Sequence, residues 1–496
     1  QTLNRLAKDK HNNGLILEIQ TSLPFATTRT LINHLTDFKE QGKEVITFAT
    51  TYSLPTYWLA SSGSQVTVQN QGSFMINGLY SSRFFLTNLM KKYGFQFEKM
   101  AVSPYKSAGD EFVRADISPE AKKNWEDLYT SIFEHIIKEI AQFRRITESE
   151  VRKAIDKAPL TDQQALERKL IDQIVSLEQL PRILRKSDKK QKSRPFSEAH
   201  KATLIPASPS MRKIVAVIPL LGIIVDGKSR EIPKELPVPF GDKQTGDHSI
   251  VPLIRAATAS SRVAAGVLYV DSPGGSFTAS ESIRLAISEF MTRKPLVAYF
   301  SNIAASGSYY IAASAHYMVA QSQTITGSIG ILSGKFNFEG FLQKYEINTA
   351  EFKIGKRADW MQPTKPLNEE ERRVLTELLF YHYDHILGVV ANGRNLEKEY
   401  LANKLAGGRV WTGAQALEHG LIDELGNFYT ALNKARKLSR LKPNSGVIAL
   451  HPPKRTTVPF FFRGPELIDY MKFLQYLSKT QIWAIEPNLM EINPLV

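Results

Sequence analysis

The second half of the chain alternates short apolar runs with amphipathic stretches. The runs GVLYV, from Gly266, and LVAYF, from Leu296, are apolar throughout and too short for helices, which is typical of buried strands. Between them, apolar residues recur at helical spacing, at Ile283, Ala286, Ile287, Phe290 and Met291. Strands and helices that alternate through short turns predict an α/β fold with a parallel sheet covered by helices.

The same pattern occurs twice along the chain at a nearly constant offset. GLILE from Gly14 matches GVLYV from Gly266, and YWLASSGSQV from Tyr57 matches YYIAASAHYM from Tyr309, both 252 positions later. Further on, LTDQQALERKLID matches WTGAQALEHGLID at an offset of 251. Because the register holds over such a length, the chain is a tandem duplication.

The duplication divides the chain into a first repeat in residues 1–183, a basic, proline-broken linker in 184–211, a second repeat in 212–445 and a tail in 446–496. The second repeat opens with a strand that has no counterpart ahead of Gly14. That strand belongs to the longest apolar run, which is shorter than the roughly 20 residues that span a bilayer, so we expect any membrane anchor to lie outside this chain. The tail mixes aromatic residues with cations, as in an interfacial helix or a surface that packs against another subunit or the same domain.

Composition limits the chemistry that the chain can perform. It has 496 residues, of which 43% are hydrophobic and 23% charged, an ordinary globular balance. It has no cysteine, which excludes disulfides, thiol catalysis and cysteine-bound metals. The net charge of +14 suits either a solvated basic surface or anionic lipid headgroups. We find no nucleic-acid motif and expect no nucleic-acid partner, metal or cofactor.

The stretch NIAASGSYYIAA delivers Ser306 at a turn between a strand and a helix, the setting of a nucleophile. The preceding strand ends at DSPGGS, and both turns should meet at the carboxyl edge of a parallel sheet. The N–H groups of Gly275 and Gly307 could then form an oxyanion hole, with Gly274 beside them. Taken singly, either turn is equally well explained as a packing feature.

A serine nucleophile needs a base, and the histidines are poorly placed to supply one. His316 follows Ser306 by ten residues and should point elsewhere, and His382 and His385 lie in a long amphipathic helix. Lysine is the alternative, provided that burial lowers its pKa. Lys106 in the first repeat and Lys356 in the second are the candidates.

At this point the chain resembles the tandem signal peptide peptidase A (protease IV) family. The motifs DSPGGS, AASGSYY and TGSIGI in the second repeat, with YKSAGDEFVRADISPEA in the first, carry the resemblance, which covers about residues 3–441. It implies a ClpP/crotonase-like fold and a Ser/Lys dyad. The serine role carries over to Ser306, the lysine role to Lys106, and that of the serine that hydrogen-bonds the lysine to Ser328.

The first repeat supports this assignment independently of the family. At the positions equivalent to Ser306 and Ser328 it carries Leu54 and Ile76, so it has lost both hydroxyls while keeping a lysine. Lys356 competes with Lys106 because single-copy relatives place their base about fifty residues after the serine. Ser308, where many relatives have glycine, could narrow the pocket.

The resemblance implies a membrane-associated serine endopeptidase that degrades peptides such as released signal peptides and assembles as a homo-tetramer. It places the protein at the bacterial inner membrane, with the active site on the extracytoplasmic side, or at an equivalent organelle membrane. Two other functions stay open: a crotonase-like acyl-CoA enzyme, and a non-catalytic scaffold at the membrane. A Ser/Lys pair has no use in the first of these.

Overall fold

The computed structural model describes residues 2–10, 12–184, 194–198, 210–231, 243–451 and 483–485. The described residues form two compact units, one drawn from residues 2–81 and 129–198 and the other from residues 82–128 and 210–485. The units divide the chain differently from the two sequence repeats, because residues 82–128 of the first repeat fold with the second. Most of the linker and of the aromatic tail lies outside the described residues. No described helix is long and apolar enough to cross a membrane.

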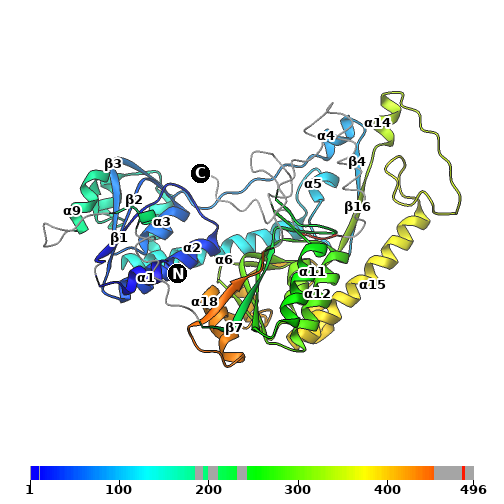
Figure 1. The fold of residues 1–496 in the computed structure, drawn as a ribbon. Helices are drawn as coiled ribbons and strands as arrows, with labels where there is room; N and C mark the ends of the chain where they lie inside the picture. The colour runs from blue at the N-terminus through cyan, green and yellow to red at the C-terminus, as the bar shows by residue number, and fades with distance from the viewer. Residues whose placement is uncertain are drawn as a thin grey trace. The chain divides into compact units, whose positions relative to one another are not determined.

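The first unit is built around a five-stranded sheet with the order β1-β2-β3-β5, in which β6 also pairs with β3. Strands β1, β2, β3 and β6 are parallel, and β5 is antiparallel to β3. Helices α2 and α3 cover the sheet (Figure 1) and bury large side chains such as Trp58. The elements are α1 Thr2–Lys8, β1 Gly14–Glu18, α2 Phe25–Glu40, β2 Glu44–Ser53, α3 Leu54–Ser61, β3 Gln65–Met75, α7 Glu148–Asp156, β5 Leu160–Thr161, α8 Asp162–Glu167, β6 Gln173–Val175 and α9 Leu180–Leu184.

The second unit contains an eight-stranded sheet with the order β17-β15-β13-β11-β7-β19, with β14 and β18 attached through β13. Its strands are β7 Ser210–Leu221, β11 Val263–Ser272, β13 Leu296–Ala305, β14 Tyr317–Ala320, β15 Ile325–Gly327, β17 Val410–Thr412, β18 Glu424–Leu425 and β19 Ser445–Ala449. All pairs except β15–β17 are parallel. The predicted α/β fold with a helix-covered parallel sheet is therefore confirmed.

Helices pack on both faces of this sheet, as the alternation along β7 requires. Ile214, Ala216 and Ile218 face one hydrophobic cluster with α11 and α12, whereas Val215 and Val217 face another with α18. In Figure 1, α11 and α12 lie side by side over the first face. The helices of the unit are α4 Thr87–Lys92, α5 Asp110–Val113, α11 Asp247–Ala259, α12 Phe277–Met291, α13 Gly307–Ala312, α14 Glu339–Lys344, α15 Glu369–Arg394, α16 Lys398–Tyr400, α17 Gly413–Glu418 and α18 Phe428–Leu438, while α6 Pro119–Arg144 runs from this unit into the first.

The duplication is visible in the element boundaries as well as in the sequence. β2 and β13 begin and end 252 residues apart, and so do α4 and α14. The β1–β2 pairing aligns Gly14 with Glu44, and the β11–β13 pairing aligns the equivalent Gly266 with Leu296. The chain is thus a tandem duplicated α/β protein.

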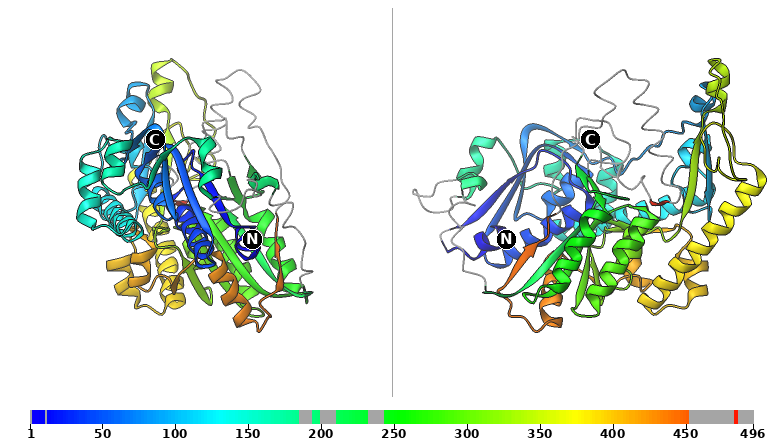
Figure 2. Two further views of the ribbon diagram at one scale, coloured as in Figure 1. Left: turned by 90° about the vertical axis from the view of Figure 1, so that its left-hand side faces the viewer. Right: turned by 45° about the vertical axis from the view of Figure 1, so that its right-hand side comes forward.

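A further sheet in the second unit has the strand order β4-β16-β20-β12-β8-β10-β9. Its strands are β4 Gln96–Ala101, β8 Ile223–Val225, β9 Arg230–Glu231, β10 Lys243–Gly246, β12 Gly274–Ser276, β16 Leu332–Asn337 and β20 Trp483–Ile485. Two expected turns are corrected here: Gly274–Ser276 of DSPGGS is a strand of this sheet, and β13 continues to Ala305, so only Ser306 separates it from α13. In Figure 2, β4 and β16 run side by side toward α14.

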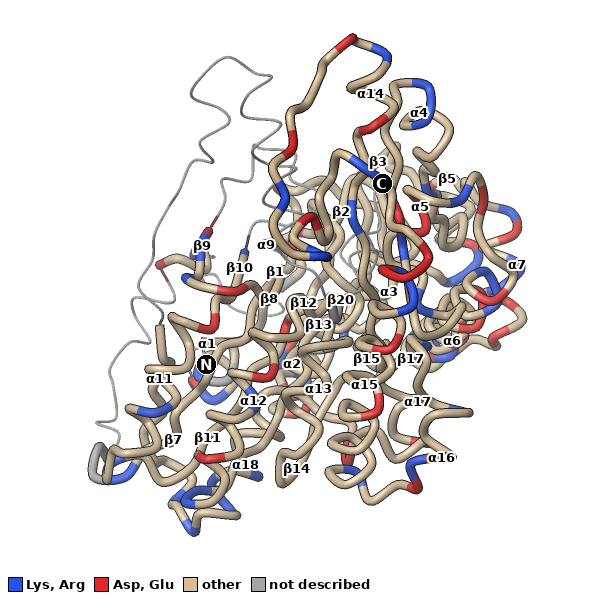
Figure 3. Tube along the Cα trace, turned by 90° about the vertical axis from the view of Figure 1, so that its right-hand side faces the viewer, with Lys and Arg blue, Asp and Glu red and all other residues tan. Residues whose placement is uncertain are grey.

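Charged side chains are distributed along the whole chain. Figure 3 shows basic and acidic residues interleaved along the trace, including on α6 and on the segment that follows α14. The positive net charge therefore does not come from one uninterrupted basic stretch of the described chain.

Candidate active site

Ser306 occupies a strained position between β13 and α13. Its backbone has a φ of 58° and a ψ of −119°, a conformation that L-residues adopt rarely and only when their surroundings hold it. The Ser306 N–H donates to the carbonyl of Gly327 on β15, at 2.8 Å, and its carbonyl accepts from Tyr310 N at 2.9 Å. The residue is only 3% exposed. The neighbouring strand and helix therefore fix the direction of the hydroxyl.

Lys106, which lies 200 positions earlier in the sequence, contacts the Ser306 hydroxyl. Its Nζ lies 2.8 Å from Ser306 Oγ, 2.9 Å from Ser328 Oγ and 3.1 Å from the Ser328 carbonyl oxygen. Lys106 and Ser328 are fully buried. The three side chains selected from the sequence thus lie together, and all three belong to the same compact unit. Burial disfavours the charged form of an amine, and a lysine must be uncharged to act as a base.

The backbone around Lys106 is positioned by β4, which pairs antiparallel with β16. Ser328 precedes β16 with a φ of 49°, and its N–H donates to Arg409 O at 2.6 Å. Lys99 on β4 donates to the Lys106 carbonyl at 2.6 Å and forms an ion pair with Asp110 at 2.5 Å. Sequence analysis did not find Lys99, because its contact with Lys106 is to a backbone carbonyl, which leaves no motif.

A second missed feature is the loop that precedes β17. A Cβ at Gly408 would lie 2.7 Å from the Cα and N of Lys106, so only glycine lets this loop approach the lysine so closely. Gly408 also has a φ of +89° and donates its N–H to Ile329 O. The first repeat carries Asp156 and Lys157 at the positions equivalent to Gly407 and Gly408. This difference between the repeats is the sequence feature from which the role of Gly408 could have been predicted.

The glycines of DSPGGS lie on β12, next to the nucleophile turn. A Cβ at Gly275 would lie 2.0 Å from Ile224 O on β8, so this close strand contact requires glycine. Ser308 is fully buried and donates its hydroxyl hydrogen toward Ser272 O, at 2.7 Å, and Ala305 O, at 2.8 Å. Its hydroxyl therefore connects the end of β11 to the nucleophile turn. Gly307 is the first residue of α13.

The competing bases lie elsewhere. The Lys356 side chain is 78% exposed and forms an ion pair with Glu370 at 2.9 Å; hydrogen bonds from Arg357 and Lys356 lower the pKa of that carboxyl to about 2. His316 lies in the turn before β14, not within a helix or strand, and accepts from Leu296 N. His382 and His385 are on α15, where His382 contacts Phe277 and His385 lies 3.6 Å from Glu281.

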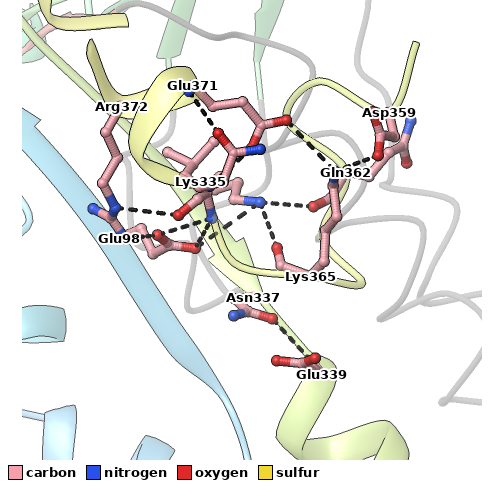
Figure 4. A network of polar contacts seen from close by, with 11 residues as sticks. Glu98, Lys335, Asn337, Glu339, Asp359, Gln362, Lys365, Glu371 and Arg372 are labelled. Atoms are coloured by element: carbon pink, nitrogen blue, oxygen red, sulfur yellow. Dashed lines mark hydrogen bonds and ion pairs between the residues drawn. The ribbon is translucent and has the colours of Figure 1, made fainter. Parts of the chain in front are cut away.

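A polar network around Glu98 and Lys335 links the middle of β4 to β16 and to the segment before α15 (Figure 4). Lys335 on β16 donates to Gln362 O at 2.8 Å and to Lys365 O at 2.6 Å, and its Nζ lies 3.9 Å from Glu98 on β4. Glu98 in turn accepts from Leu367 N and pairs with Arg372 on α15. Burial is the main cause of the lowered pKa of Lys335. The network fixes β4, the strand that precedes Lys106, relative to β16, the strand that follows Ser328.

We expect Lys335→Met to lower the free energy of unfolding by about 2 kcal/mol, because two buried carbonyl groups lose their donor while the side-chain volume is kept. Chemical denaturation measures the change. Lys91→Met, at an exposed lysine on α4, is the matched control and should change stability by less than about 0.5 kcal/mol. Equal effects of the two substitutions would show that the network does not stabilise the β4–β16 pair.

Comparison with known proteins identifies the family. The sequence matches Peptidase family S49 over residues 37–192 and 288–442, one stretch for each repeat. It is 30% identical over 439 residues to Protease 4 of Haemophilus influenzae, covering 83% of this chain and 68% of that protein. It is 30% identical over 454 residues to Protease 4 of Salmonella typhi, covering 88% and 71%. Over 472 residues it is 25% identical to the chloroplastic serine protease SPPA of Arabidopsis thaliana, covering 93% and 68%. These matches confirm the family resemblance, and the chain belongs to Peptidase family S49.

Proposed function

We propose that the protein is a serine endopeptidase in which Ser306 is the nucleophile and Lys106 is the general base. The observation that carries this proposal is the 2.8 Å separation of Lys106 Nζ and Ser306 Oγ inside a buried site. General bases act at hydrogen-bond distance from the proton that they remove. The assignment also agrees with the loss of both hydroxyls at the equivalent positions of the first repeat, Leu54 and Ile76.

The oxygens around Lys106 suit a neutral amine. Such an amine has two N–H donors and one lone pair, and the Ser328 hydroxyl and carbonyl oxygens lie at 2.9 and 3.1 Å as acceptors. With both hydrogens engaged there, the lone pair is directed to the proton of Ser306. As Oγ attacks the peptide carbonyl, Lys106 takes that proton and then gives it to the leaving amine. In the second half of the reaction, Lys106 Nζ takes a proton from a water molecule that attacks the acyl carbonyl, and then gives it to Ser306 Oγ as the bond between Oγ and the acyl carbon breaks.

We assign the oxyanion hole to the N–H groups of Gly275 and Gly307, with Gly274 part of the substrate-binding strand. The close contact of Gly275 with β8 and the hydrogen bonds of Ser308 hold the two backbone segments beside each other. Fixed donors of this kind stabilise the charge that develops on the carbonyl oxygen in the transition state. No metal or cofactor has a role in this mechanism.

The substrate binds as an extended peptide alongside β12, at the position that β20 takes in this structure. Within the protein itself, β20 lies antiparallel to β12, with Gly275 opposite Ala484, and pairs at Leu332 with β16. An extended segment therefore fits between these two strands, and the backbone groups there can recognise a peptide by strand addition. We propose remnants of signal peptides at a membrane as the substrates, in keeping with the names of relatives such as the putative signal peptide peptidase SppA of Enterococcus faecium.

A serine-reactive peptidyl phosphonate tests the proposal. We expect one covalent adduct per chain, mapped by mass spectrometry to the peptide that contains Ser306, because phosphonates react with activated serines and not with ordinary hydroxyls. Unreacted protein, or an adduct on another residue, would overturn the assignment. Unreacted protein would instead favour the acyl-CoA enzyme or the non-catalytic scaffold, whereas an adduct on another residue would show that the nucleophile is not Ser306.

A further inference from the structure

A second lysine lies against the backbone of the proposed base. Lys99, on β4, has a side chain that is only 8% exposed. Its ammonium group donates to the carbonyl oxygen of Lys106 at 2.6 Å and forms an ion pair with Asp110. A lysine is rarely buried to this degree unless its charge is paired and hydrogen-bonded, and here both conditions are met. The catalytic cycle described above gives Lys99 no proton to transfer, so its role has to lie in what it holds in place.

The segment that carries Lys106 has no regular secondary structure to fix it. Residues 102–109, between β4 and α5, form turns and bends. The N–H of Lys106 donates to Ser103 O at 3.1 Å, which closes a turn within the segment. Its carbonyl oxygen accepts from the side chain of Lys99, seven residues earlier. The Lys99 side chain therefore takes the place of the backbone donor that a neighbouring strand or helical turn would supply.

Lys99 connects both ends of this segment to β4. Asp110, the partner of its charge, is the first residue of α5, the helix that follows the segment. Phe97 precedes Lys99 by two residues and so lies on the same face of β4. Its ring packs on that of Phe112 in α5, with centroids 5.7 Å apart. Because β4 is itself paired with β16 over six residues, the Lys99 contacts tie the backbone of Lys106 to a rigid pair of strands.

Comparison of the two repeats links Lys99 and Asp110 to the base. At the offset of 252 residues that relates α4 to α14, the second repeat replaces Lys99, Lys106 and Asp110 with Glu351, Ala358 and Gln362. The repeat without the base thus lacks the cation that holds the base and the anion that balances this cation. The repeat that keeps the base keeps all three. This joint presence and joint loss fits a pair of residues that serves Lys106.

We propose that Lys99 is a positioning residue for the general base: it holds the carbonyl of Lys106 against β4, with Asp110 balancing its charge, and so directs the amine at Ser306. This proposal rests on the proposed function, in which Lys106 takes the proton of Ser306. A misplacement of about 1 Å in a catalytic group can cost about 100-fold in rate. Loss of the Lys99 contact should therefore slow the removal of the proton and change the binding of the peptide much less.

The double variant with Lys99→Met and Asp110→Asn tests the proposal, because it removes the donor and both charges and leaves no buried charge unpaired. We expect the kcat for a fluorogenic peptide and the rate constant of phosphonate labelling at Ser306 each to fall by about 10- to 100-fold, with KM changed by less than about threefold. Lys99→Arg keeps a cation that can donate to both oxygens, and should keep both rates within about fivefold of the wild type. A double variant with wild-type kcat and labelling rate would overturn the proposal.

Lys294→Met is the matched control for a purely structural effect. Lys294 also donates to two backbone carbonyl oxygens, those of Ala257 and Ser260, but it precedes β13 whereas Ser306 follows that strand. We expect this variant to lose Tm and to keep kcat and the labelling rate within about threefold of the wild type.

The same experiment separates failure of this proposal from failure of the proposed function. If Lys294→Met and the Lys99 double variant lose activity in proportion to their loss of Tm, Lys99 has only a structural role and the proposal is wrong. If the wild type itself is not labelled at Ser306, the proposed function fails, and the positioning role fails with it. Labelled wild-type protein with an equally reactive Lys99 double variant overturns the positioning role alone.

Discussion

We expect Ser306→Ala to reduce peptide hydrolysis by at least about 10³-fold, because removing a nucleophile ends covalent catalysis and leaves only binding and charge stabilisation. The substitution should hardly change stability. Alanine keeps the Cβ, so the backbone with a φ of 58° bears the same strain as before. Lys106 Nζ loses its contact with the Ser306 hydroxyl but keeps its contacts with the two oxygens of Ser328.

The measurement is the kcat/KM of a fluorogenic peptide, together with the Tm of the same preparation. Ser308→Ala is an instructive control, since it removes a neighbouring hydroxyl that hydrogen-bonds only backbone carbonyls among the contacts described for it. The kcat/KM of Ser308→Ala should be at least about ten times that of Ser306→Ala. If Ser306→Ala still cleaves peptides after host peptidases have been removed, another residue is the nucleophile.

The α/β architecture could be predicted because its signal is local. Short apolar runs, helical stripes and the offset of 252 residues all lie on the printed sequence, and the bounds of β2 and β13 follow them. The site residues depended on motifs around Ser306 and Lys106, which are also local. The contact between Ser306 and Lys106, which are 200 positions apart, could be predicted only from the family resemblance and not from residue patterns.

The features that were missed are those that depend on pairing across the fold. DSPGGS has the composition of a turn, yet Gly274–Ser276 form a strand because β8 lies close enough to pair with it, and this contact tolerates only glycine. Gly408 is essential to the site for the same kind of reason, the approach of one backbone to another. The division into compact units likewise depends on β4 pairing with β16, which draws residues 82–128 away from their own repeat.

The two repeats have become complementary in their chemistry. The first keeps Lys106 but has Leu54 and Ile76 in place of the two serines. The second keeps Ser306 and Ser328, but at an offset of 252 it carries Ala358 where the first has Lys106. Neither repeat therefore holds a full set of proposed catalytic groups at equivalent positions, and one site is assembled from both.

This complementarity predicts opposite results for two lysine substitutions. Lys106→Met keeps the bulk of a fully buried side chain and removes the amine, so we expect kcat/KM to fall by at least about 10³-fold. Two contacts to Ser328 are lost as well, which should lower stability by about 1–3 kcal/mol without unfolding the chain. Lys356→Met removes an exposed amine from an ion pair with Glu370 and should keep most of the activity.

Peptide hydrolysis and thermal unfolding should be measured for both variants in the same assembly state, since either lysine could alter association. If Lys356→Met is inactive and Lys106→Met is active, the second repeat is a self-sufficient peptidase and the first has only a structural role. If both are inactive while Ser306 still reacts with the phosphonate in Lys106→Met, the amine is not needed to activate the serine. Only the loss of both hydrolysis and labelling in Lys106→Met, with both retained in Lys356→Met, fits a base that lies 2.8 Å from the nucleophile.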